Sequence, residues 1–214
     1  AGSMFEEGVL IPHMRIRSEG NLNDDVLSII QANSRNPVEV MGDIRSLLSC
    51  NDAGVARFAD MLNEFELDTL DDLSRHIIES SATAMRQAIQ SVPDGVFSAQ
   101  MTIDGYEKPI NLKARLTVDK ERVHLDYSES SSASRFGINS PKCYTDAYSV
   151  FGLKCVIAPD VPNNAGSLGC FEIVAEPGSC VAPERPAPVT ARHVIGQMLP
   201  DMVFGCLAQA LPDR

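Results

Sequence analysis

The histidines are the residues of this sequence best suited to acid–base or metal chemistry, and they lie far apart. They are His13, His76, His124 and His193. No two share a spacing that would place a pair of imidazoles on one metal ion, so the sequence predicts no metal site. His193 follows a proline-rich loop at the expected start of a helix, a place where ligands often bind. A hydrogen-bonded structural role for His193 is the alternative.

Amide and carboxylate side chains form a second group of candidates. The adjacent Asn163 and Asn164 can each donate and accept hydrogen bonds, so their segment is either a structured turn or a polar loop that lines a cleft. Asp201 follows Pro200 and could cap a helical segment or point into a pocket. We expect these groups where the C-terminal segment packs on a β-sheet. The candidate pocket-lining or substrate-orienting residues are Asn139, Asn163, Asn164, His193 and Asp201.

The cysteines favour a reduced protein. The sequence has six of them, without a C-x-x-C pair, which argues against a zinc knuckle or a redox pair. We therefore expect free, mostly buried thiols. A weaker hypothesis is a cofactor-free enzyme that uses Cys143 or Cys170 with His193. The sequence contains neither a phosphate-binding loop nor the G-x-S-x-G motif of serine hydrolases, so no nucleotide or serine-hydrolase site is predicted.

Charge and hydropathy exclude several classes of partner. The 18 basic and 29 acidic side chains give a formal net charge of −11, which argues against nucleic acid and against anionic membrane surfaces. No apolar run approaches the roughly 18 residues of a membrane helix, and no signal peptide opens the chain. A cytoplasmic protein is therefore the expectation.

The hydrophobic pattern predicts an α+β fold with a helical subdomain, a three-stranded antiparallel meander and a proline-rich α/β tail. Residues 1–22 are expected to form an extended arm, in which residues 1–3 could be the remnant of a cleaved tag or native. Residues 23–92 carry apolar stripes at helical spacing. Residues 93–135 combine period-two alternation with a Ser-rich loop, expected to be mobile. Residues 136–214 form the tail.

The start and stop signals locate individual elements within these regions. Four helices are predicted to begin near Asn23, Asn36, Asn51 and Thr69, because each of these residue types caps helices well. The tail should contain a helix over 143–156, a short strand over 170–175 and a last helix over 190–211. Pro200 must kink or interrupt that last helix.

Several short motifs, in a fixed order, resemble one family. They are Phe5 to Pro12, Asn23 to Asp25, Gly42 to Arg45, Pro93 to Gly95, Ile138-Asn139, Pro162 to Gly166, Pro177 to Ser179, Pro186 to Pro188 and Ala208 to Arg214. Together they resemble the B-type subunit of the N-methylhydantoinase, 5-oxoprolinase and acetone carboxylase family. No single motif is specific; their number and order carry the resemblance.

The resemblance implies a function that is shared with a partner. Members of the family work with an A-type subunit or region, which binds ATP and phosphorylates the substrate. The B-type region then completes ring opening of a cyclic amide or imide, or carboxylation of a ketone. An oligomeric assembly and a small cyclic amide or ketone substrate are therefore expected. A non-catalytic module that docks on the A-type subunit is the alternative.

The resemblance also covers only the middle of a typical B-type subunit. The divalent metal of the family is bound by His and Asp motifs upstream of Phe5, and nothing in this sequence matches them. No cofactor is therefore assigned to this chain, and we expect it to be inactive alone.

Overall fold

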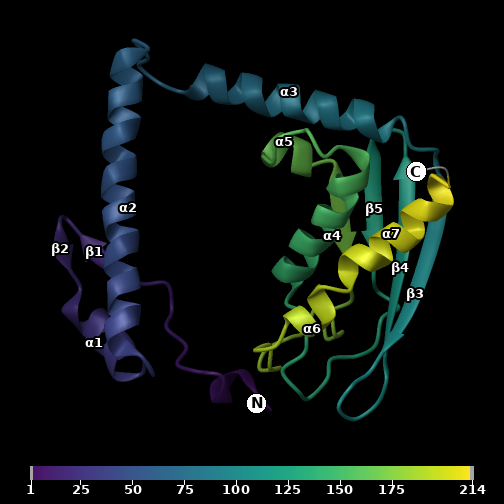
Figure 1. Cartoon of the computed structure of the whole chain (residues 1–214), viewed down its shortest axis with the longest axis horizontal. Helices are drawn as coiled ribbons and strands as arrows, with labels where there is room; N and C mark the ends of the chain where they lie inside the picture. The colour runs from purple at the N-terminus through teal and green to yellow at the C-terminus, as the bar shows by residue number, and fades with distance from the viewer. Residues whose placement is uncertain (1, 213–214) are drawn as a thin grey trace. The chain divides into compact units, whose positions relative to one another are not determined.

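A mixed four-stranded sheet supports the larger of two structural units in the computed structural model, which describes residues 2–212 (Figure 1). Its strands are β3 (Gly95–Ile103), β4 (Ile110–Asp119), β5 (Arg122–Asp126) and β6 (Phe171–Val174), in that spatial order. The first three pair antiparallel, whereas β6 lies parallel to β5. The α+β class is confirmed, but the sheet is not the predicted three-stranded meander, because the short strand of the tail joins it.

The sheet has one apolar and one polar face, as its sequence alternation requires. Along β4, the side chains at even positions from Ile110 to Val118 are buried, and those at odd positions are polar and mostly exposed. Successive side chains of a strand point to opposite faces, so this pattern fixes which face meets the core. Leu116 lies opposite Phe97 on β3 and opposite Leu125 on β5.

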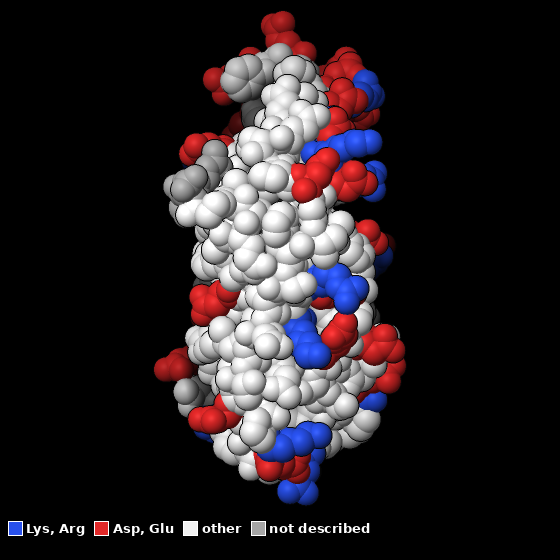
Figure 2. Space-filling model, turned by 90° about the vertical axis from the view of Figure 1, so that its right-hand side faces the viewer, with Lys and Arg blue, Asp and Glu red and all other residues white. Residues whose placement is uncertain are grey.

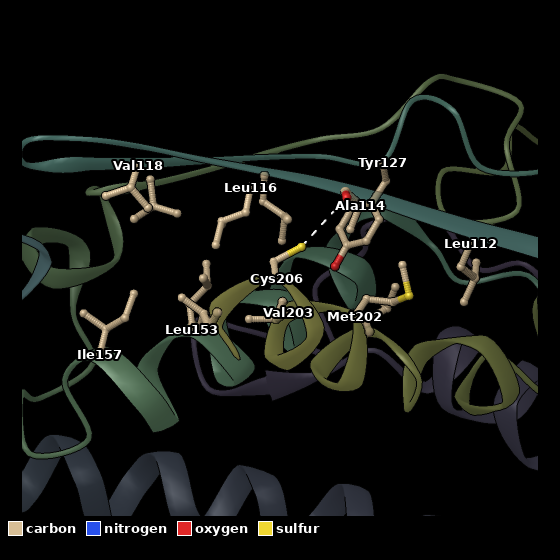
Figure 3. Packing of buried hydrophobic residues seen from close by; sticks show 14 of the residues in the cluster. Leu112, Ala114, Leu116, Val118, Tyr127, Leu153, Ile157, Met202, Val203 and Cys206 are labelled. Carbon is tan, nitrogen blue, oxygen red and sulfur yellow. Dashed lines mark hydrogen bonds between the residues drawn. The ribbon is translucent and has the colours of Figure 1, made fainter. Parts of the chain in front are cut away.

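Two helices cover the apolar face. They are α4 (Lys142–Ile157) and α7 (Leu199–Ala210), and their buried side chains meet those of β4 (Figure 3). The short helix α6 (His193–Gly196) precedes α7. Pro200 lies in the first turn of α7, where a missing N–H group costs no hydrogen bond, so the predicted interruption of the last helix is confirmed.

The larger unit consists of a short N-terminal stretch and the residues from Leu73 onward. Helix α3 (Asp71–Ile89) and the short helix α5 (Ala165–Leu168) complete it. Met85 and Ile89 of α3 are fully buried in the same hydrophobic core as β4. At the N-terminus, a 3₁₀ turn over Met4–Glu6 is followed by Glu7, whose carboxylate accepts hydrogen bonds from the amides of Val189 and Thr190.

The second unit comprises Gly8–Asp72. It contains a small hairpin, β1 (Arg17–Ser18) and β2 (Asn21–Leu22), with helices α1 (Asp24–Ala32) and α2 (Pro37–Glu64). Asn23 caps α1 as predicted, since its side-chain oxygen accepts a hydrogen bond from the amide of Val26. None of the helices in residues 2–212 is long and apolar enough to cross a membrane.

The helix predicted to begin at Asn51 does not exist as a separate element. Residues 37–64 form one continuous helix of 28 residues, so the prediction of a break at Asn51 is wrong. Asn and Asp favour helix starts but cost little inside a helix, and neither proline nor a glycine pair interrupts the backbone there. Asp52 forms a two-point ion pair with Arg17 of the hairpin instead of capping a helix.

The Ser-rich loop is hydrogen-bonded along its length, against the expectation of a mobile segment. Ser130 exchanges hydrogen bonds with the backbone of Lys113, and Ser131 does so with the backbone of Asn111. The loop therefore continues the hydrogen bonding on the β5 side of β4 beyond the end of β5. Serine hydroxyls can replace backbone partners in this way because each both donates and accepts.

Candidate functional site

A largely apolar pocket lies beside α4 in the larger unit. Its volume is about 840 Å³, which is large enough for a small-molecule ligand. One wall comes from α4, and the others come from the segment 159–163, from α5 and from β6. The apolar side chains in its lining are Ala147, Val150, Phe151, Pro159, Val161, Pro162, Leu168, Phe171 and Ile173.

Lys154 is the one basic side chain among the described residues that line this pocket. It is 7% exposed, and its Nζ donates a hydrogen bond to the carbonyl oxygen of Val161. Burial disfavours the charged form, so the pKa of Lys154 is lowered. Within residues 2–212 it forms no ion pair with a carboxylate. An ammonium group has three N–H bonds, so Lys154 can still donate to an acceptor on a ligand.

Polar groups at the pocket's rim add charge and hydrogen-bonding capacity. Asp146 lies on the α4 wall and is paired with Lys142, which also donates a hydrogen bond to the carbonyl oxygen of Ile173 at 2.9 Å. Asp160 and Asn163 lie in the opposite segment. The arrangement suits an apolar molecule with a carbonyl or carboxylate oxygen, which the ammonium of Lys154 would receive.

Of the five predicted site residues, the pocket contains one, Asn163. Its neighbour Asn164 has another role, because its side-chain oxygen accepts hydrogen bonds from the amides of Gly166 and Ser167 at 2.9 and 3.2 Å. The amide group of Asn164 also donates to the hydroxyl of Ser81 at 2.8 Å. Asn164 therefore forms a structured turn that starts α5.

Asn139 is buried and joins the loop around residues 134–136 to the backbone at Pro188. Its side-chain oxygen accepts a hydrogen bond from the amide of Ser134 at 2.8 Å. Its amide group donates to the carbonyl oxygens of Ser134, Phe136 and Pro188, at 2.8, 3.2 and 3.0 Å. The three acceptors share the two N–H bonds of the amide group, so Asn139 has no free donor for a ligand.

The structure does not place the two remaining candidates in the pocket. His193 starts α6 and is exposed, and Asp201 is exposed in the first turn of α7. Neither lines the pocket beside α4. Within residues 2–212, no group of three His, Cys, Asp or Glu side chains is placed to hold a metal ion.

Sequence reasoning missed Lys154, although a signal was present. It lies in the last turns of α4 among Leu153, Val156 and Ile157, so it is a charged residue in an otherwise apolar stretch. A lysine at such a position must either extend to solvent or find an internal partner. The partner, Val161, lies only seven residues after Lys154, so a short-range pattern could have indicated it.

The six cysteines divide equally into exposed and buried thiols, all of them free. Cys50, Cys143 and Cys155 are exposed, so the prediction of mostly buried thiols is wrong for half of the set. Burial raises the pKa of the Cys180 thiol to about 12 and that of Cys206 to about 11. The pKa of Cys170 is also raised, mainly by burial, which is opposite to the shift that a nucleophilic thiolate needs.

Thiol labelling should separate the two groups. With a disulfide reagent at pH 8 and the protein folded, three thiols per chain should react rapidly, and the remaining three only on unfolding. The reason is that the reactive species is the thiolate, which burial suppresses at Cys170, Cys180 and Cys206. Mass spectrometry of the labelled peptides checks the assignment. Fast labelling of Cys170 would restore the hypothesis of a nucleophilic cysteine.

Comparison with known proteins gives a consistent result across the chain. A family model described as hydantoinase B/oxoprolinase matches residues 1–214. The B-type subunit of the putative D-/L-hydantoinase of Pseudomonas sp. (strain NS671) is 27% identical, over 98% of this chain and 38% of its own length. The 5-oxoprolinase of Dictyostelium discoideum is 23% identical, over 97% of this chain and 17% of its own.

One solved structure shares this fold closely. The crystal structure of ATP-dependent caprolactamase from Pseudomonas jessenii superposes with a TM-score of 0.91 and 22% sequence identity. The match covers 99% of this chain and 37% of that one. The chain thus spans less than half the length of each of these three similar proteins.

Proposed function

This chain belongs to the hydantoinase B/oxoprolinase family, and we propose on that premise that it is part of a B-type subunit of an ATP-dependent hydrolase of cyclic amides or imides. The observation that carries the proposal is the family match over the whole chain. Similar proteins, among them the hydantoinase and 5-oxoprolinase described above and the beta chain of caprolactamase, support the same reaction class.

In the proposed complex, the ATP-binding site lies on another chain. ATP is bound by an A-type subunit, which activates the substrate, and a divalent metal is held by B-type residues outside this sequence. The chain then contributes the scaffold and a wall of the substrate site, and it has no turnover alone. A carboxylase role is the second candidate, because the delta subunit of acetophenone carboxylase from Aromatoleum aromaticum is 21% identical over 99% of this chain.

The test is to mix the 214-residue chain with an A-type hydantoinase subunit. We expect a stable complex by size-exclusion chromatography with light scattering, and no release of ADP coupled to ring opening by the chain alone. Absence of any complex with A-type subunits would overturn the proposed partner. ATP-dependent ring opening by the pure chain would overturn its dependence on a partner. Bicarbonate-dependent consumption of a ketone by the complex would favour the carboxylase role.

Within this function, we propose that the pocket beside α4 receives the apolar part of the substrate. The pocket wall is largely aliphatic and aromatic, and the ammonium of Lys154 and the amide of Asn163 can donate to a carbonyl oxygen. His193, Asp201 and Asn139 lie outside its lining, and any role of His193 or Asp201 toward substrate stays a prediction.

The substitution Lys154→Met tests this pocket. Methionine keeps the unbranched shape of the side chain but removes the donor, so the affinity for caprolactam should fall about tenfold, equivalent to about 1.4 kcal/mol. Ligand-observed NMR titration measures the change. Lys154→Arg should retain most of the affinity, and Lys108→Met, in an exposed turn, should retain all of it. Equal binding by Lys154→Met and the unchanged chain would contradict the assignment.

A further inference from the structure

The outer edge of the sheet is formed by β3, and its free backbone groups can be identified. On β4, the backbones of Asn111 and Lys113 bond to the loop at Ser130 and Ser131, on the β5 side. Backbone groups alternate in direction along a strand, so the even positions of β4 bond to β3. These pair with the odd positions of β3, and the register leaves the backbone groups of Val96, Ser98, Gln100 and Thr102 directed outward.

This edge lacks the features that normally prevent strand pairing. Over Gly95–Ile103, β3 contains no charged residue and no proline, and it is nine residues long. Exposed edge strands are usually short, or protected by lysine, proline or a bulge. Figure 2 looks onto the side of the molecule that carries β3, and a band of uncharged surface runs along it, with charged side chains mainly at its borders.

One side chain protects a single point of the edge. Gln209 of α7 donates a hydrogen bond from its amide group to the carbonyl oxygen of Ser98 at 2.8 Å. The other outward groups of β3 have no partner strand in the described part of the chain, where β4 is the one neighbour of β3. The inward side chains of β3, including Phe97 and Met101, are only partly buried. An added strand would therefore satisfy backbone groups and cover apolar side chains.

We propose that two copies of this chain pair through β3, antiparallel, about a twofold axis at Ser98. A twofold axis places the same surface on both copies, so the strand must be complementary to itself. In this register Val96 lies opposite Gln100 on the polar face, and Phe97 lies opposite Ala99 on the apolar face. The two four-stranded sheets then join into one sheet across the dimer.

The charges next to β3 disfavour the neighbouring register with the axis at Ala99. That axis would place Asp94 opposite Asp104 of the other copy. Like charges directly opposite one another destabilise a strand pair. With the axis at Ser98, Asp94 lies opposite Thr102 and Asp104 lies opposite Val92, so no pair of like charges meets.

The first test is the oligomeric state of the 214-residue chain by sedimentation velocity, from about 1 to 200 μM. We expect a reversible dimer. In Ser98→Lys, two lysines would lie directly opposite each other at the axis, and the dissociation constant should rise at least about tenfold. The added lysine also reduces the magnitude of the net charge of −11. A smaller net charge would strengthen any non-specific association, so a weaker dimer would show that the pairing through β3 itself is disrupted.

Thr117→Lys is the matched control, because it adds the same charge to the same face of the sheet, one strand further from the edge. It should dimerise like the unchanged chain. Gln209→Ala frees the carbonyl oxygen of Ser98 and should tighten the dimer. Circular dichroism confirms that each variant is folded.

Hydrogen exchange provides an independent measurement of the paired residues. At concentrations where the dimer predominates, the amides of Val96, Ser98, Gln100 and Thr102 should exchange more slowly than at about 1 μM, while those of the odd positions stay protected throughout. A chain that stays monomeric up to about 200 μM would overturn the proposal. So would a dimer in which these four amides are unprotected, or one that Ser98→Lys leaves unchanged.

Discussion

The substitution Asn139→Ala is expected to lower the free energy of unfolding by about 3 kcal/mol. The reason is that one buried side chain makes hydrogen-bond contacts to the backbone of three residues in two segments, at Ser134, Phe136 and Pro188. A buried group that loses its partner costs about 1–3 kcal/mol, and alanine would leave several such groups at once. Urea unfolding followed by circular dichroism measures the difference.

The matched control for Asn139 is Asn163→Ala. Both asparagines were candidates from the sequence, but Asn163 is exposed at the rim of the pocket. Substitutions at exposed positions of this kind change stability by no more than about 0.5 kcal/mol. If Asn139→Ala were as mild as Asn163→Ala, the hydrogen-bonded junction at Asn139 would not hold the segments together.

The asparagines also show which features the sequence alone does not predict. The residue types and their loops were recognised, but the roles depend on partners far apart in the chain. Asn139 meets Pro188, and Asn164 meets Ser81. No local pattern contains such pairs, so a candidate set drawn from the sequence mixes structural and ligand-facing residues.

The helices and strands also divide into features that depend on local sequence, which were predicted, and features that depend on distant partners, which were not. The period-two alternation of β4 predicted its buried face correctly, since that pattern depends only on the strand itself. The pairing of β6 with β5 was not predicted, because a parallel neighbour is reached through a long connection that includes α4. The continuity of α2 through Asn51 was missed because capping residues indicate where a helix could begin, but not that the preceding helix has ended.

The pocket beside α4 was also inaccessible to sequence reasoning as a whole. Its lining combines α4, β6 and the segment between them, which only the folded chain brings together. The burial of Lys154 shows that this lysine is turned inward and does not extend to solvent. The sequence did identify Asn163 at its rim. A resemblance to a family can thus predict the reaction class, whereas the contacts of each side chain decide which residues can take part.

The substitution Leu116→Ala should have the largest effect on stability, about 3–4 kcal/mol. Leu116 is fully buried at the centre of the sheet, between Phe97 and Leu125, and its side chain points toward the helices that cover this face (Figure 3). Removing a buried leucine side chain loses its transfer free energy and leaves a cavity, at a total cost of about 2–5 kcal/mol.

Thr117→Ala, one residue further along β4, is the control. Thr117 points to the polar face, so its substitution should cost less than about 1 kcal/mol. The midpoint of urea unfolding should fall markedly for Leu116→Ala and little for Thr117→Ala, with the same slope for both, because neither changes the surface that unfolding exposes. Equal losses would mean that the two faces of β4 are not distinguished by burial. Since the α4 wall of the pocket and the edge strand β3 both rest on this layer, such a result would also remove the structural basis for assigning roles to them.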